Sequence, residues 1–161
     1  MGNTNIHKVL EEILTLEKDT LTRKNGRFEQ VYDPSLPPIE ADEDQLKQVF
    51  LNLIKNAIEA SRKSGKIQIV TRISSGYSVK AATSPVPQQN IVVEIIDSGE
   101  GMNEETQKML FTPFHTTKKK GSGLGLPISL KIVKDHNGKI KITSEQGLGT
   151  TVQVFLPTRQ R

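Results

Sequence analysis

The chain has 161 residues, enough for one domain with a substantial core, and its 34% hydrophobic and 25% charged residues are typical of a globular protein. Because it contains no cysteine, disulfides, cysteine–zinc sites and thiol catalysis are excluded. The net charge is +4, but the basic residues are dispersed among 18 acidic ones and only 4% of residues are aromatic, so we expect no nucleic-acid binding.

The chain also lacks the marks of a membrane or secreted protein. No apolar run approaches the ~20 residues that a membrane span requires, and no signal peptide is visible at the start. We therefore expect a cytoplasmic location for this domain, whether or not its parent protein is attached to a membrane. A single domain over 1–161 is expected, with a disordered start at 1–4.

The first half of the chain predicts two helices separated by extended segments. Apolar residues recur at near-helical spacing over 5–22, which predicts an amphipathic helix. A strand is expected over 27–33, and 33–42 is an extended connection because it carries three prolines. Asp42 is then expected to cap a second helix, with Gln45 three residues later as in a capping box. This helix is expected to end near 64–65, and its buried stripe comprises Leu46, Val49, Phe50, Leu53, Ile54, Ala57 and Ile58.

The middle of the chain reads as two strands around a polar insert. Residues 66–73 alternate as a strand, and 74–90, which is polar and carries proline and serine, is expected to be a peripheral loop. Residues 91–96 are apolar apart from Glu94, which predicts a strand buried on both faces or at a sheet centre. A short helix is expected over 104–111.

The end of the chain predicts a helix and a hairpin. An apolar helical run opens at the glycines before Leu126 and ends at Asn137-Gly138. Strands over 139–144 and 150–156 follow, joined by a glycine turn at 147–149. Helices and strands in mixed order favour an α+β fold, a two-layer sandwich.

Two asparagines stand out on the second predicted helix. Asn52, Asn56 and Glu59 share a face beside the apolar stripe, since residues three or four apart are helical neighbours. Asparagine lowers helix propensity, and a buried amide needs partners. An amide oxygen is a fair single ligand for Mg²⁺, which takes water and substrate phosphates as its other ligands. The alternative is a pair of surface or capping amides.

A second candidate is DSGEGM, Asp97 to Met102, at the end of the apolar strand. This position places one carboxylate in the wall of a pocket, and an ionised carboxylate only accepts hydrogen bonds. It could therefore bind the exocyclic amino group of adenine and reject the carbonyl of guanine. The glycines would let the ring approach the backbone. A plain turn is the alternative.

A third candidate is the glycine-rich stretch that opens the last helix. Gly121, Gly123 and Gly125 alternate with other residues, and a lysine run, 118–120, precedes them. A helix N-terminus after such a loop suits an anion such as phosphate. The stretch is not a P-loop, because the motif G-x-x-x-x-G-K-[ST] is absent. It is not the dinucleotide-binding motif G-x-G-x-x-G either, because Leu126 occupies the position of the last glycine. A flexible loop with solvated lysines is the alternative.

Together, in this order, the motifs resemble the GHKL superfamily, and within it the ATP-binding domain of sensor histidine kinases. The N box resembles DEDQLKQVFLNLIKNAIEAS, the first glycine box DSGEGM, the F box FTPFHTTK and the second glycine box GSGLGL. The match runs over about 42–157. The resemblance implies a Bergerat-type sandwich in which helices cover one face of a mixed sheet.

The resemblance also implies ATP and Mg²⁺ as cofactors. Asn56 would hold Mg²⁺ and Asn52 would face the phosphates, while 115–122 would form an ATP lid. Thr150 or Thr151 would support the adenine through water, and of these we favour Thr151. The other implied nucleotide-binding residues are Asp97, Gly99, Gly101, Phe114, Lys118, Gly121, Gly123, Leu124 and Gly125.

One position favours a kinase over an ATPase of the same superfamily. The ATPases carry a glutamate one turn before the metal-binding asparagine to activate water, and here that residue is Asn52. His7, His115 and His136 do not match the acceptor pattern, a histidine followed by an acid and a proline. We therefore expect a protein histidine kinase fragment that does not turn over alone and donates the γ-phosphate to a histidine on a dimerisation domain outside this chain. The alternatives are a GHKL-type ATPase and a degenerate nucleotide-binding module.

Within the kinases, the chain is most similar to the NtrB group of nitrogen-regulation kinases. NIHKVLEEI, the N box and the proline-bearing insert before IIDSGEGM carry this finer resemblance. It implies an NtrC-like response regulator and a PII-type signal protein as partners. The fragment is expected to be monomeric and its parent a homodimer.

Overall fold

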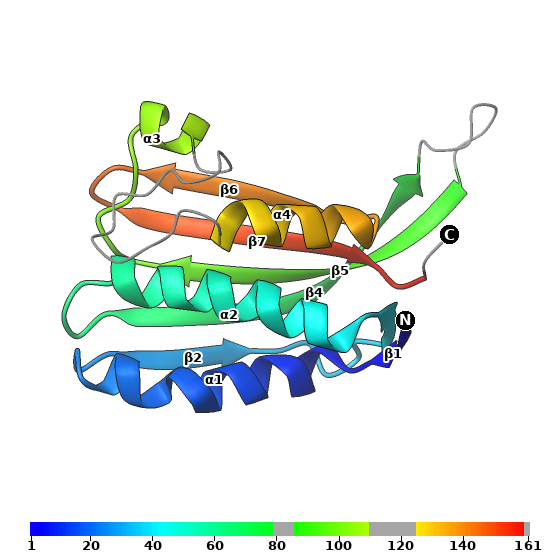
Figure 1. The fold of residues 1–161 in the computed structure, drawn as a ribbon, viewed down its shortest axis with the longest axis horizontal. Helices are drawn as coiled ribbons and strands as arrows, with labels where there is room; N and C mark the ends of the chain where they lie inside the picture. The colour runs from blue at the N-terminus through cyan, green and yellow to red at the C-terminus, as the bar shows by residue number, and fades with distance from the viewer. Residues whose placement is uncertain (79–85, 110–124, 160–161) are drawn as a thin grey trace.

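The computed structural model describes residues 1–78, 86–109 and 125–159. Figure 1 shows a sheet with three helices on one face: α1 (Ile6–Thr22), α2 (Glu43–Ala60) and α4 (Gly125–Asp135). A short helix, α3 (Glu104–Met109), lies beyond one edge of the sheet. The two layers confirm the predicted α+β sandwich. None of the helices in these three ranges is long and apolar enough to cross a membrane.

The main sheet has five strands in the order β2-β4-β5-β7-β6. The strands are β2 (Arg27–Val31), β4 (Lys66–Ser78), β5 (Val86–Asp97), β7 (Gly149–Pro157) and β6 (Lys139–Glu145). β2 is parallel to β4 and the other neighbours are antiparallel, so the sheet is mixed. A separate two-stranded sheet pairs β1 (Gly2–Thr4) with β3 (Ile39–Ala41). Chain order thus differs from sheet order, and β7 lies between β5 and β6.

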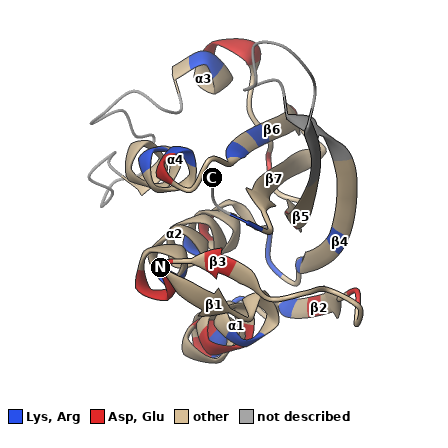
Figure 2. Cartoon of the chain, turned by 90° about the vertical axis from the view of Figure 1, so that its right-hand side faces the viewer, with Lys and Arg blue, Asp and Glu red and all other residues tan. Residues whose placement is uncertain are grey.

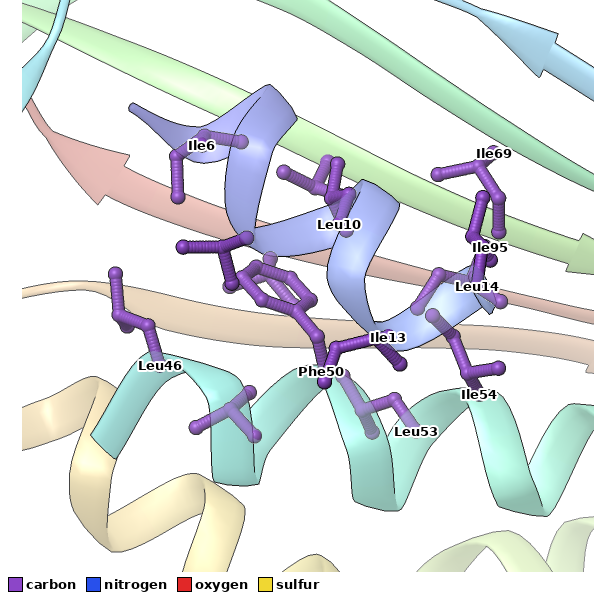
Figure 3. Packing of buried hydrophobic residues seen from close by; sticks show 14 of the residues in the cluster. Ile6, Leu10, Ile13, Leu14, Leu46, Phe50, Leu53, Ile54, Ile69 and Ile95 are labelled. Carbon is purple, nitrogen blue, oxygen red and sulfur yellow. The ribbon is translucent and has the colours of Figure 1, made fainter. Parts of the chain in front are cut away.

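The core lies between the sheet and the helices. Ile91, Val93 and Ile95 of β5 belong to this core, and they share one face of the sheet because successive side chains of a strand point to opposite faces. Figure 3 shows Phe50 of α2 next to side chains of α1, and Ile69 of β4 and Ile95 of β5 close to Leu14 of α1. Asp97 follows Ile95 by two positions on β5, so its side chain lies on the same, helix-covered face of the sheet.

Helix α2 begins as predicted but ends earlier. The Asp42 carboxylate accepts a hydrogen bond from the Gln45 N–H at 3.2 Å, which confirms the predicted cap. The helix ends at Ala60 and not near 64–65, because Ser61 takes an extended conformation. Lys24, in the turn that follows α1, donates from Nζ to the Ile58 carbonyl at 2.8 Å, so a cation distant in sequence satisfies a carbonyl of the last turn of α2.

Two expectations about irregular segments are wrong. Residues 1–4 are not disordered: β1 pairs with β3, and the Thr4 hydroxyl donates to the Ala41 carbonyl at 3.4 Å. The expected loop over 74–90 is largely strand, since the β4–β5 ladder continues from Ser74 opposite Asn90 to Ser78 opposite Val86. Backbone pairing needs no apolar pattern, so polar residues extend a ladder that an apolar segment has started. Residues 79–85 lie outside the described residues.

Charge is mixed over the described surface. Figure 2 shows basic and acidic residues side by side on α1 and on α4. Several are paired: Lys47 lies 2.8 Å from Glu12, and Arg72 lies 3.0 Å from Glu94. Such interspersed charge is typical of a solvated surface and does not favour a polyanionic duplex as partner.

Candidate nucleotide-binding site

Three segments that are distant in sequence meet at one end of the sandwich. They are the second half of α2, the loop that follows β5, and the first turn of α4. α2 and α4 lie side by side on the sheet, and the Asn52 amide of α2 reaches the first residue of α4. The sequence-predicted asparagines, the Asp97 motif and Gly125 are therefore brought to the same end of the fold.

Asp97 provides a fixed acceptor in this site. Its side chain is 7% exposed, and its Oδ1 accepts hydrogen bonds from the Gly99 N–H at 2.9 Å and the Thr150 N–H at 3.3 Å. Burial raises the pKa of this carboxyl above its ordinary value, while the two backbone hydrogen bonds oppose that rise. Since both bonds go to Oδ1, Oδ2 is the oxygen that can accept from a ligand.

The two glycines of the Asp97 motif are required by the protein's own packing. A Cβ on Gly99 would collide with the Ala60 carbonyl oxygen at the end of α2. Gly101 has φ +70°, and a Cβ there would collide with the Glu145 carbonyl oxygen. The loop is thus clamped between α2 and the end of β6. This packing is a steric reason for glycine at both positions, and the expectation that they let a ring approach the backbone stays a prediction.

Asn52 holds α4 against α2. Its Nδ2 lies 3.4 Å from the Gly125 carbonyl oxygen and 3.4 Å from the Ser129 hydroxyl. Gly125 packs against the Asn52 side chain, so that a Cβ there would lie 3.7 Å from Cγ. With its nitrogen facing α4, the amide presents its oxygen away from α4. Asn56 lies one turn further along α2 and is half-buried.

The two candidate threonines lie on opposite faces of the sheet. Thr150 is the cross-strand partner of Asp97, whereas Thr151 is opposite Ile96. Cross-strand partners share a face, so Thr150 lies with Asp97 on the helix-covered face and Thr151 does not. The preference for Thr151 is therefore corrected to Thr150, whose hydroxyl also lies 2.9 Å from the Ser144 hydroxyl.

Sequence reasoning missed two serines that support the site. Ser129 is fully buried on α4 against Asn52, and the only sequence signal was a serine inside an apolar helical run. Ser144 accepts the Met102 N–H at 2.8 Å, a contact that depends on strand order. Of the remaining predicted residues, Phe114, Lys118, Gly121, Gly123 and Leu124 lie outside the described residues, as does the expected lid over 115–122.

Most of the chain matches a known protein family. Residues 41–160 match the family of histidine kinase-, DNA gyrase B- and HSP90-like ATPases. The chain is 38% identical over 155 residues to sporulation kinase C of Bacillus subtilis, covering 96% of this chain and 33% of that protein. It is 42% identical over 156 residues to the sensory histidine kinase/phosphatase NtrB of Azospirillum brasilense, covering 95% of this chain and 38% of that protein. The chain thus spans well under half the length of these relatives.

Solved structures of histidine kinases share this fold. The nucleotide-free catalytic domain of the histidine kinase ThkA has a TM-score of 0.79 and 31% identity, with 99% of this chain and 97% of that chain covered. ThkA in complex with the response regulator protein TrrA gives a TM-score of 0.74 and 29% identity, with 97% of this chain and 41% of that chain covered.

The fold and the match over most of the chain define an ATP-binding domain of the GHKL class. The chain belongs to the histidine kinase-, DNA gyrase B- and HSP90-like ATPase family, and within it is the catalytic ATP-binding domain of a two-component sensor histidine kinase.

Proposed function

We propose that this domain binds Mg-ATP at the end of the sandwich where Asp97, α2 and α4 meet, and that it donates the γ-phosphate to a histidine of the dimerisation domain of the same kinase. The observation that carries the proposal is the buried Asp97 carboxylate, held by two backbone N–H groups and lying on the same face of the sheet as α2 and α4. Both relatives reported above are kinases by name.

Asp97 would select adenine. Its Oδ2 is an acceptor, and adenine offers an amino donor where guanine offers a carbonyl oxygen. Thr150 would add a second polar group beside it, since its N–H already bonds Asp97 and its hydroxyl lies on the same face. A buried carboxylate facing an acceptor would lose its hydration without compensation, which disfavours guanine.

Asn56 and Asn52 would serve the phosphates and the metal. Asn56 offers an amide oxygen, a hard ligand that fits Mg²⁺, with phosphate oxygens and water as the other ligands. The Asn52 oxygen, directed away from α4, would accept from metal-bound water, since an amide oxygen repels phosphate oxygens. When bound, Mg²⁺ supplies charge neutralisation of the triphosphate.

The N-terminus of α4 would face the phosphate end of the nucleotide. Gly125 begins an 11-residue helix, whose first N–H groups have no partner within the helix. Lys118, Gly121, Gly123 and Leu124, which precede it in sequence, remain proposed phosphate ligands, and Phe114 the anchor of the lid. Positioning and charge stabilisation would supply most of the catalysis, as is usual for phosphoryl transfer.

Two of the chain's histidines have structural roles that disfavour them as acceptors. His136 is fully buried, with Nδ1 donating to the Ile132 carbonyl at 2.8 Å and Nε2 accepting from the Asp42 N–H at 3.0 Å. His7 is stacked on Tyr32 with centroids 4.4 Å apart, and its Nε2 lies 2.8 Å from the Thr71 hydroxyl. His115 lies outside the described residues. The structural roles of His7 and His136 support the proposal that the acceptor histidine belongs to another domain.

The proposed kinase role also implies partner proteins for the full-length parent. A response regulator would receive the phosphoryl group, as the complex of ThkA with TrrA suggests. The similarity to NtrB favours an NtrC-like regulator, a PII-type signal protein and a cytoplasmic, homodimeric parent. Sporulation kinase C is similar at nearly the same identity, so the nitrogen-regulation role needs its own test: phosphotransfer from the full-length kinase to an NtrC-type receiver should exceed transfer to unrelated receivers.

The kinase proposal is tested by comparing this chain with its full-length parent. Incubated with Mg-ATP, the parent should acquire an acid-labile, base-stable phosphoryl group, whereas this chain should acquire none and release phosphate slowly. Asn52 cannot act as a general base, which is the physical reason for slow hydrolysis. Rapid phosphate release by the isolated chain, without a labelled histidine in the parent, would identify an ATPase instead.

A further inference from the structure

Helix α3 is attached to the rest of the fold by polar contacts. It has six residues, and none of them is buried. A helix this short has no stability of its own in water. Asn103 immediately precedes the helix, and its side-chain oxygen accepts the Thr106 N–H at 2.8 Å. This cap shapes the helix, but another side chain must fix it to the sheet.

Gln107 makes that attachment with one nitrogen atom. Its Nε2 donates to the Met102 carbonyl at 3.0 Å and to the Ser144 carbonyl at 3.1 Å. A side-chain amide has two N–H donors, and both are used here. Because both partners are carbonyl oxygens, the nitrogen and not the oxygen must face them. Gln107 therefore joins α3, the end of the Asp97 loop and the end of β6.

The contacts of Gln107 lead step by step to Asp97. The Met102 N–H donates to the Ser144 hydroxyl at 2.8 Å, so Met102 is held through both its N–H and its carbonyl. The Ser144 hydroxyl lies 2.9 Å from the Thr150 hydroxyl. The Thr150 N–H in turn bonds Asp97 Oδ1 at 3.3 Å. Of these five residues, Asp97 and Thr150 belong to the proposed adenine site, whereas Gln107, Met102 and Ser144 support it from behind.

We propose that Gln107 is a positioning residue for the adenine site: by holding Met102 and Ser144 it fixes the loop and the strand end that orient Asp97. The proposal rests on the adenine-binding role of Asp97 given above. In this role Gln107 acts through Met102 and Ser144, whose carbonyl oxygens accept its hydrogen bonds.

The packing of the loop explains why one side chain should matter. Gly99 and Gly101 give the segment 98–102 a backbone that is free to take many conformations. At the Asp97 end it is held by the Gly99 N–H, and in the middle Gly101 lies directly against the Glu145 carbonyl. At the Met102 end the described contacts are those with Ser144 and Gln107. Without Gln107, the carbonyl of Met102 loses its partner, and at this end the loop keeps only the hydrogen bond from the Met102 N–H to the Ser144 hydroxyl.

The test compares variants of this chain by calorimetry and thermal melting. Gln107→Leu removes both donors, and Gln107→Glu removes them while keeping the shape. Lys108→Leu, at an exposed neighbouring position on the same helix, is the matched control. We expect the Kd for Mg-ATP to rise about tenfold in both Gln107 variants and the weaker GTP binding to change little, so that the preference for adenine falls. The control should retain the wild-type affinities.

A double-mutant cycle separates positioning from general loss of stability. Ser144→Ala alone should also weaken ATP binding, and combining it with Gln107→Leu should cost less than the product of the two effects, because both act on Met102. Binding is measured well below every melting temperature. Unchanged ATP affinity and selectivity, whatever the change in melting temperature, would overturn the inference, as would equal weakening of ATP and GTP. Absence of ATP binding by the wild-type chain would instead overturn the proposed function, and this inference with it.

Discussion

Replacing Asp97 with asparagine should change which purine this domain prefers. In the wild-type structure Oδ1 receives two backbone N–H groups, from Gly99 and Thr150. An asparagine in the same rotamer must therefore keep its oxygen at the Oδ1 position, where the two donors are. Its NH2 group is then forced into the Oδ2 position and points a donor at the amino group of adenine.

The loss of ATP-binding free energy in this variant can be estimated from the hydrogen bond that it removes. A hydrogen bond to a charged acceptor contributes about 1.5–3 kcal/mol, and facing two donors at each other adds to the loss. We expect about 3 kcal/mol in total, which corresponds to a roughly 150-fold rise in the Kd for ATP. The new amide can donate to the carbonyl of guanine, so GTP should bind better than it does to the wild type.

The assay is calorimetric titration of both proteins with Mg-ATP and Mg-GTP. The folded state should be preserved because the two backbone hydrogen bonds remain, and thermal melting checks this. Wild-type ATP affinity in the Asp97→Asn variant, with unchanged discrimination between the purines, would refute the adenine-reading role of this carboxylate.

Further predictions concern pH, packing and the buried histidine. Burial raises the pKa of Asp97, so the uncomplexed domain gains stability from this group at low pH and loses it as the pH rises through the folded-state pKa. ATP affinity should show the opposite trend, falling as Asp97 is protonated, and Asp97→Asn should remove both dependences in melting and titration experiments. Gly99→Ala should cost about 2 kcal/mol or more in the free energy of unfolding, since its Cβ meets the Ala60 carbonyl, whereas Gly2→Ala, with open space around it, should cost little; denaturant unfolding distinguishes them. His136→Ala should cost about 3 kcal/mol, because it opens a cavity and leaves the Asp42 N–H without its acceptor, and a loss below about 1 kcal/mol would contradict that role.

The regular elements could be predicted because their signals are local. The apolar spacing of 5–22 defines α1 within a residue, and the Asp42–Gln45 pair gave the start of α2 correctly. The end of α2 could not be read in the same way. There Lys24, which is distant in sequence, donates a hydrogen bond to the Ile58 carbonyl of the last turn. No local sequence pattern predicts this contact.

Some strands could not be predicted from local sequence patterns. Polar segments at 2–4 and 74–78 become strands because partners elsewhere in the chain offer backbone groups, and an alternating apolar pattern is not needed for that. The pairing register of the strands is a second feature that local sequence patterns do not predict. A shift of one residue moves a side chain to the other face of a sheet, so Thr150 and Thr151 could be told apart only once the pairing of β5 with β7 was known.

In the candidate site, too, some features have a local sequence signal and others depend on contacts between distant segments. An acid at the end of an apolar strand and two asparagines one turn apart are local patterns, and the fold brings them to one end of the sandwich. The roles of Gly99, Ser129 and Ser144 come from contacts between segments far apart in sequence, and these needed the structure. The roles of the residues in the second glycine box stay predictions.

The central claim is that this domain holds Mg-ATP selectively without hydrolysing it. The most direct measurement is calorimetric titration of the wild-type chain with ATP and GTP, with and without Mg²⁺, while phosphate release is followed in the same samples. We expect saturable, Mg²⁺-assisted binding of ATP, much weaker binding of GTP, and almost no phosphate release. Equal affinity for both purines, no binding, or rapid hydrolysis would contradict it.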